Sequence, residues 1–214
     1  MEGLWVRGYK DLINQMKKLG FNTIRIPISN QMLRSGAVVT GVDYTRNNDL
    51  VGLSPLQCLD MIVNYCGISG MRVILNRYSA FGGNALNEPL WYIPGDRYYT
   101  DSRFIADWTM LALRYRNTAV IGADLWNTPR AVTWGDGNVL TDWLLASQRA
   151  GNAILAVNNK WLIIVEGTAW GSSLTGVQNR EVILNVPNRV VYSVQLYSND
   201  VAADPTVCIS QLIL

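Results

Sequence analysis

The sequence of 214 residues contains no histidine. This absence excludes Ser-His-Asp and Cys-His nucleophiles, imidazole metal ligands, and any unperturbed side chain that titrates near neutral pH. Glutamate is also scarce, and its positions are Glu2, Glu88, Glu166 and Glu181. Acid–base chemistry in this chain must therefore come from carboxylates, tyrosine, lysine or perturbed thiols.

Charge and cysteine are sparse as well. Charged residues make up 16% of the chain, and the formal net charge of +2 gives no reason to expect a nucleic acid or an anionic membrane as partner. Cys58 and Cys66 fall eight residues apart in one predicted helix, too far for a disulfide, and Cys208 stands alone. No CxxC pair is present, so the sequence predicts buried thiols, no metal site and no cofactor.

Two further features are missing. No apolar run reaches the roughly 18 to 20 residues of a membrane helix, and residues 1–12 lack the cationic and apolar regions of a signal peptide. The localisation therefore stays unknown from the sequence. What is present is a 49% apolar composition, which suits a globular core.

Five short β-rich runs alternate with helical patterns. The predicted strands are Thr23–Ser29, Arg72–Tyr78, Val120–Asn127, Trp161–Gly167 and Arg189–Tyr197. Their near-continuous Val, Ile and Leu content is typical of strands buried on both faces of a parallel sheet. The predicted helices are Gly8–Leu19, a segment beginning at Ser54-Pro55, Ser102–Arg116 and Thr141–Val157.

This alternation predicts an α/β fold with right-handed crossovers, in one domain over residues 1–214. The longest connections follow strands, at residues 30–53, 79–101 and 128–140, which is where (β/α)₈ barrels place their active sites. We therefore expect a TIM-barrel-like fold. A doubly wound sheet is the alternative, but no GxGxxG or P-loop motif supports it.

Polar and aromatic side chains stand at the predicted strand ends. Arg25 lies inside an apolar strand, where it needs a carboxylate or substrate partner, and Asp124 is the candidate partner. Asn127, Gln195 and Tyr197 close later strands. Amides hydrogen-bond hydroxyl groups and indoles stack on sugar rings, so this set would suit a polyhydroxylated ligand.

Several segments together resemble glycoside hydrolase family 5, in its cellulase-like endoglucanase branch. They are LGFNTIRIP, RVILNRY, VIGADLWNTP, RAGNAILAVN, WLIIVEG and LNVPNRVVYS, in the order that the family has them. The resemblance implies a (β/α)₈ barrel that hydrolyses β-glycosidic bonds with retention, a β-linked glucan as partner, and a family that is usually secreted. It also implies an acid/base glutamate after the fourth strand and a nucleophilic glutamate at the end of the seventh.

The resemblance also exposes departures from the family pattern. Thr128 occupies the acid/base position, in Asn127-Thr128-Pro129. A threonine hydroxyl cannot protonate a departing sugar oxygen at a useful rate. Positions where the family has histidine carry Tyr78, Trp126 and Gln195, and Asn76 replaces an aspartate. Arg25, Asn127 and Tyr197 match the family's arginine, asparagine and tyrosine.

The first strand and the last two strands of the barrel are not recognisable in the sequence. From this we expect an incomplete barrel without the nucleophile region, whose open sheet edges favour self-association.

Two glutamates are candidates for an alternative pair of carboxylates. Asn87-Glu88-Pro89 spells the family's tripeptide but lies in a loop, and Glu166 ends a strand. For Glu166 we favour a structural or hydrogen-bonding role over catalysis. The candidate sugar-stacking residues are Trp91, Trp126, Trp134 and Trp170.

Three hypotheses follow. The leading one is a catalytically impaired family member, a pseudoenzyme, that retains a carbohydrate-binding cleft. The second is an active glycosidase with an atypical pair such as Glu88 and Glu166. The third is a structural protein whose sheet edges assemble with a partner chain.

Overall fold

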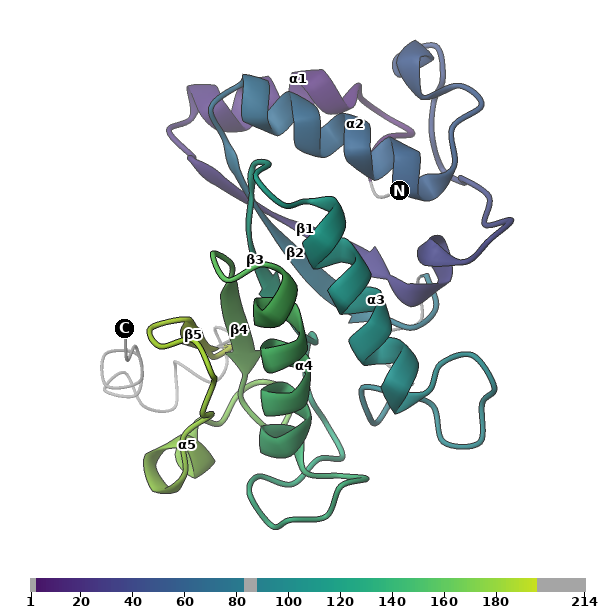
Figure 1. The fold of residues 1–214 in the computed structure, drawn as a ribbon. Helices are drawn as coiled ribbons and strands as arrows, with labels where there is room; N and C mark the ends of the chain where they lie inside the picture. The colour runs from purple at the N-terminus through teal and green to yellow at the C-terminus, as the bar shows by residue number, and fades with distance from the viewer. Residues whose placement is uncertain (1–2, 83–87, 196–214) are drawn as a thin grey trace, which may run out of the picture.

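A computed structural model describes residues 3–82 and 88–195. These residues form one five-stranded sheet in which every neighbouring pair is parallel and the strands follow chain order (Figure 1). The strands are β1 (Thr23–Ser29), β2 (Arg72–Ser79), β3 (Val120–Asp124), β4 (Leu162–Glu166) and β5 (Val190–Ser193). The predicted α/β architecture with a parallel sheet is confirmed.

An α-helix precedes every strand. The helices are α1 (Tyr9–Lys18), α2 (Pro55–Ile68), α3 (Asp101–Arg114), α4 (Trp143–Val157) and α5 (Thr175–Asn179). Two 3₁₀ turns follow β1, η1 (Asn30–Leu33) and η2 (Asn48–Leu50). Neither α5 nor the 3₁₀ turns were predicted, because segments this short show no helical periodicity. Among the described residues, no helix has the length and apolar character needed to cross a membrane.

Local signals fix the helix starts. Ser54 and Gln57 form a reciprocal capping box ahead of Pro55, which is the first residue of α2. Asp142 caps α4 by accepting the backbone N–H of Leu145. The same carboxylate also accepts N–H groups from the loop before α4, which ties that loop to the helix.

The hydrophobic core lies between the sheet and the helices on one of its sides (Figure 1). Alternate strand residues such as Val73, Leu75 and Ile163 face this core and are fully buried. Large aromatic side chains from the helices, including Trp108 and Trp143, fill it. Cys58 and Cys66 are buried free thiols, as predicted, and Cys208 lies outside the described residues.

The other set of alternate residues carries polar groups on the opposite side of the sheet. β3 ends at Asp124, three residues earlier than predicted, because the chain turns there. Asn127 N–H donates to the carbonyl of Arg77, and Thr128 adopts a left-handed backbone conformation with φ of 53°. This turn directs residues 127 and 128 over the strand ends.

The tight contact between β3 and β4 generates a stability prediction. A Cβ atom at Gly122 would lie 2.9 Å from the carbonyl oxygen of Leu162, and backbone cannot move aside easily. Gly122→Ala should therefore lower the free energy of unfolding by about 1–3 kcal/mol in urea titrations. As a control, Gly67→Ala in α2 meets only an ordinary 3.5 Å contact and should be neutral or stabilising by up to about 1 kcal/mol. Equal effects of the two substitutions would contradict this description of the interface.

Candidate active site at the strand ends

Arg25 connects three strands at the centre of the candidate site. Its Nε donates to Asp124 Oδ2 over 2.7 Å, and its Nη2 donates to Glu166 Oε1 over 2.7 Å. Nη2 also reaches Asn127 Oδ1 at 3.2 Å. The predicted pairing of Arg25 with Asp124 is confirmed. The arginine side chain is 43% exposed while the two carboxylates are buried, so the guanidinium covers them.

Glu166 is completely buried, and its carboxylate accepts hydrogen bonds from several sides. Besides Arg25, the Nε2 of Gln195 lies 3.0 Å from both oxygens, and the backbone N–H of Thr128 donates to Oε2 over 2.7 Å. Burial, reinforced by the nearby charge of Asp124, raises the pKa of Glu166 to about 7. The predicted hydrogen-bonding role fits these contacts.

Asp124 lies on the side of the sheet opposite the hydrophobic core, next to Asn76, its register partner on β2. Both side chains are almost inaccessible to solvent. Burial raises the pKa of Asp124, and the positive charge of Arg25 opposes this effect. The residues beneath the site, Asn76, Asp124 and Glu166, therefore form a buried polar layer.

Thr128 lies directly above this layer and is 7% exposed. Its Oγ1 accepts hydrogen bonds from Asn127 Nδ2 at 3.3 Å and from Arg130 Nη2 at 3.1 Å. A φ of 53° is unusual for a β-branched residue and costs free energy. The hydrogen bond from the Thr128 backbone N–H to Glu166 Oε2 stabilises this backbone conformation.

Arg130 is a site residue that the sequence reasoning missed. Its guanidinium lies 4.5 Å from the centre of the Trp170 ring, and its Nη1 donates to the backbone carbonyl of Glu88 over 2.9 Å. Trp170 follows β4 and is 52% exposed, and its backbone N–H bonds to Pro129. The position of Arg130, two residues after Thr128, was the one available signal.

The structure requires a correction for Trp91. It was expected in the cleft, but it is 1% exposed, packs against Trp143, and donates its indole N–H to Asp101. Its ring has no face open to a ligand. Trp126 is equally buried. The sequence alone could not show that Trp91 and Trp126 are buried and Trp170 is exposed, because the exposure of each indole depends on tertiary packing.

The other predicted ligand contacts are distributed around the strand ends. Tyr78, at the end of β2, is 40% exposed. Trp134 is half-buried, and its indole N–H donates to the carbonyl of Arg180 over 2.8 Å. Tyr197 lies outside the described residues. The structure thus brings Arg25, Asn127, Thr128, Glu166 and Gln195 into one hydrogen-bonded cluster, with Trp170 joined to it through Arg130.

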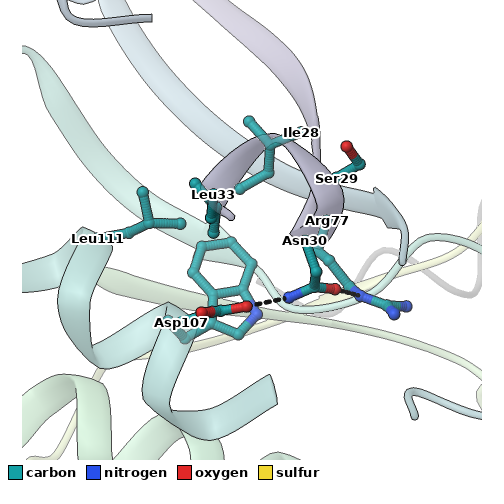
Figure 2. A pocket seen from close by; sticks show the side chains of 8 residues that line it. Ile28, Ser29, Asn30, Leu33, Arg77, Asp107 and Leu111 are labelled. Atoms are coloured by element: carbon teal, nitrogen blue, oxygen red, sulfur yellow. Dashed lines mark hydrogen bonds between the residues drawn. The ribbon is translucent and has the colours of Figure 1, made fainter. Parts of the chain in front are cut away.

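The carboxylate of Glu88 is not part of this hydrogen-bonded cluster, although its backbone carbonyl binds Arg130. Its carboxylate accepts the backbone N–H groups of Ala80 and Phe81 and lies 3.4 Å from Arg77 Nη2. Figure 2 shows Arg77 bonded to Asn30, which in turn bonds to Asp107 of α3 beside a small pocket. Arg77 and Asn76 are adjacent on β2 and so point to opposite sides of the sheet. Glu88 therefore binds a residue of the helix-covered side, and Asn87 lies outside the described residues.

Glu166 generates a prediction about pH. Its pKa is raised in the folded state, so the folded chain holds this proton up to about pH 7, whereas the unfolded chain releases it near its ordinary pKa of 4.5. The free energy of unfolding should therefore fall as pH rises through this range, by on the order of a few kcal/mol. Glu166→Gln cannot ionise and should remove this part of the pH dependence in urea titrations.

The matched control is Glu181→Gln, which changes an exposed glutamate after α5. It should leave the pH dependence as in the unmodified protein. Identical pH profiles for the unmodified protein and Glu166→Gln would show that Glu166 is ionised throughout this range.

Comparisons with known proteins agree with the fold and the sequence pattern. A family model described as cellulase (glycosyl hydrolase family 5) matches residues 1–210. An endoglucanase from Paenibacillus polymyxa is 47% identical over 218 residues, covering 96% of this chain and 54% of that protein. The major extracellular endoglucanase of Xanthomonas campestris pv. campestris is 39% identical over 216 residues, covering 94% of this chain and 43% of that protein.

Solved structures give the same result. The catalytic domain of the Xanthomonas endoglucanase superposes with a TM-score of 0.83 at 39% identity, covering 94% of this chain and 60% of that chain. A hyperthermophilic endocellulase from Pyrococcus horikoshii also gives 0.83, at 35% identity, covering 98% of this chain and 63% of that chain.

The chain spans about half the length of the curated relatives it matches. Its ends therefore say nothing about whether the protein has the nucleophile-bearing region. The five parallel strands are part of a (β/α)₈ barrel. The chain belongs to glycosyl hydrolase family 5.

Proposed function

We propose that the strand-end cluster binds a β-linked glucan and that hydrolysis is impaired because Thr128 stands at the acid/base position. One observation carries the proposal: Thr128 Oγ1 is held by Asn127 and Arg130 at the centre of the cluster. A hydroxyl group there can hydrogen-bond a sugar but cannot supply the proton that a departing sugar oxygen needs.

The groups around Thr128 support sugar binding. Arg25 is 43% exposed, and it lies beside the amides of Asn127 and Gln195. These groups suit hydroxyl groups of a sugar. The half-exposed indole of Trp170 offers an apolar face of the kind that stacks on a pyranose ring.

The carboxylates of the cluster are poorly placed to replace the missing acid. Asp124 and Glu166 both bind Arg25 at 2.7 Å, so the guanidinium fills the space between them and a glycosidic bond cannot lie there. Neither carboxylate is exposed. Glu88 binds Arg77, on the other side of the sheet from Glu166, which argues against an atypical pair of these two glutamates.

Binding through the exposed indole can be tested by substitution. Trp170→Ala should weaken the affinity for a soluble β-glucan oligosaccharide such as cellotetraose by about 3- to 10-fold, measured by titration calorimetry. Phe21→Ala is the control, because this ring is 59% exposed but precedes β1, at the amino ends of the strands. Equal effects of the two substitutions would place the binding surface elsewhere.

Impaired hydrolysis is tested by incubating the pure protein with carboxymethylcellulose and measuring the release of reducing sugar. We expect no turnover above that of a heat-denatured sample. Turnover that is abolished by Glu166→Gln or by Glu88→Gln would overturn the proposal and favour an active glycosidase with an atypical carboxylate.

Assembly through the sheet edges is a second candidate function. Within the described residues β1 and β5 each pair on one side only, and such edges can accept another strand. If assembly dominates, size-exclusion chromatography with light scattering should show an oligomer of this chain or a complex with a partner chain. A stable, well-folded monomer would remove this candidate.

A further inference from the structure

Arg130 contacts the side chain at the acid/base position directly. Its Nη2 lies 3.1 Å from Thr128 Oγ1. Two other contacts orient the guanidinium: Nη1 donates to the Glu88 carbonyl, and the Trp170 ring lies beneath it at 4.5 Å. A positive charge is therefore held against the side-chain oxygen of residue 128.

A general acid works only if it still holds its proton at the pH of the reaction. A carboxyl group meets this condition when its surroundings disfavour the ionised form. A guanidinium within about 4 Å does the opposite, and typically lowers a carboxyl pKa by about 1–3 units.

We propose that Arg130 is a second determinant of the impaired acid step, because its guanidinium would hold a carboxyl group at position 128 in the ionised form. Replacing Thr128 by glutamate would then restore the carboxyl group without restoring a proton donor. This inference rests on the proposed function, since it concerns the same position. Arg130 acts through residue 128 and is a positioning residue rather than a catalytic one.

Other ionisable groups also surround position 128. The groups are Glu166 of β4, Asp124 of β3, Arg25 of β1, Glu88 of the loop after β2, and the phenol of Tyr78. Glu166 is near the backbone of residue 128, but it is paired with Arg25 and covered by Gln195. Asp124 is paired with Arg25 and Glu88 with Arg77. Arg130 is the charge in contact with the side chain itself, so its effect should exceed the others.

The backbone at position 128 should accept glutamate. A φ of 53° is more costly for a β-branched residue than for an unbranched one. Thr128→Glu therefore removes the branching at a strained position, although it lengthens the side chain.

The experiment measures the pKa of the carboxyl group that Thr128→Glu introduces, by ¹³C NMR of glutamate-labelled protein. The sequence has glutamate only at positions 2, 88, 166 and 181, so the additional signal is readily assigned. We expect this pKa to lie at least one unit below the ordinary value of 4.5, and to rise by about 1–3 units in Thr128→Glu/Arg130→Gln. Thr128→Glu/Arg46→Gln is the control, because Arg46 is exposed and pairs with Asp43 in the loop after β1.

An ordinary or raised pKa in Thr128→Glu would overturn the inference, as would an equal response to Arg130→Gln and Arg46→Gln. If Thr128→Glu does not fold, Thr128→Cys in a Cys208→Ser background provides the same comparison through the pH dependence of thiol alkylation. The thiol pKa should then be lowered and should rise with Arg130→Gln; an unchanged thiol pKa would also overturn the inference. These readouts do not depend on glucan binding or turnover, so the proposed function can fail separately.

Discussion

The contact of one guanidinium with two buried carboxylates organises this molecule. Arg25 of β1 binds Asp124 of β3 and Glu166 of β4. Because β2 lies between β1 and β3, the arginine side chain reaches across one strand. Burying two carboxylates without a counter-charge would be strongly unfavourable. The positive charge of Arg25 offsets this desolvation cost and the repulsion between the two carboxylates. These ion pairs join β1 to the carboxyl-terminal ends of β3 and β4. The buried pairs in turn position the neighbouring residues: Asn127 bonds to Arg25, and Thr128 and Gln195 bond to Glu166.

The same contact accounts for the burial of a carboxyl group at the end of β4. Both oxygens of Glu166 are occupied, and Arg25 shields them from the open side of the sheet. Thr128 adjoins this cluster with 7% of its surface exposed, and the guanidinium next to its side chain belongs to Arg130. Under the proposed function, binding and bond cleavage are separable at this site: Arg25, Asn127 and Trp170 would bind the sugar, whereas Thr128 would supply no proton.

The sequence predicted those parts of the structure that depend on local patterns. All five apolar runs contain strands, and a helix begins at the predicted Ser54-Pro55 segment. The position of Arg25 among apolar neighbours correctly indicated a carboxylate partner. Features that depend on tertiary contacts were missed. Trp91 and Trp170 look alike in sequence, but packing buries one and exposes the other. Arg130 gained its significance only when the turn after β3 brought it against Thr128 and Trp170.

The most direct measurement of the central claim is a crystal structure of the unmodified protein grown with a β-glucan oligosaccharide. We expect an intact oligosaccharide that contacts Arg25 and Asn127, stacks on Trp170, and passes Thr128 with its glycosidic bond unbroken. Cleaved sugar at the strand ends, a glycosyl group covalently attached to a carboxylate, or an oligosaccharide bound away from this cluster would contradict this claim.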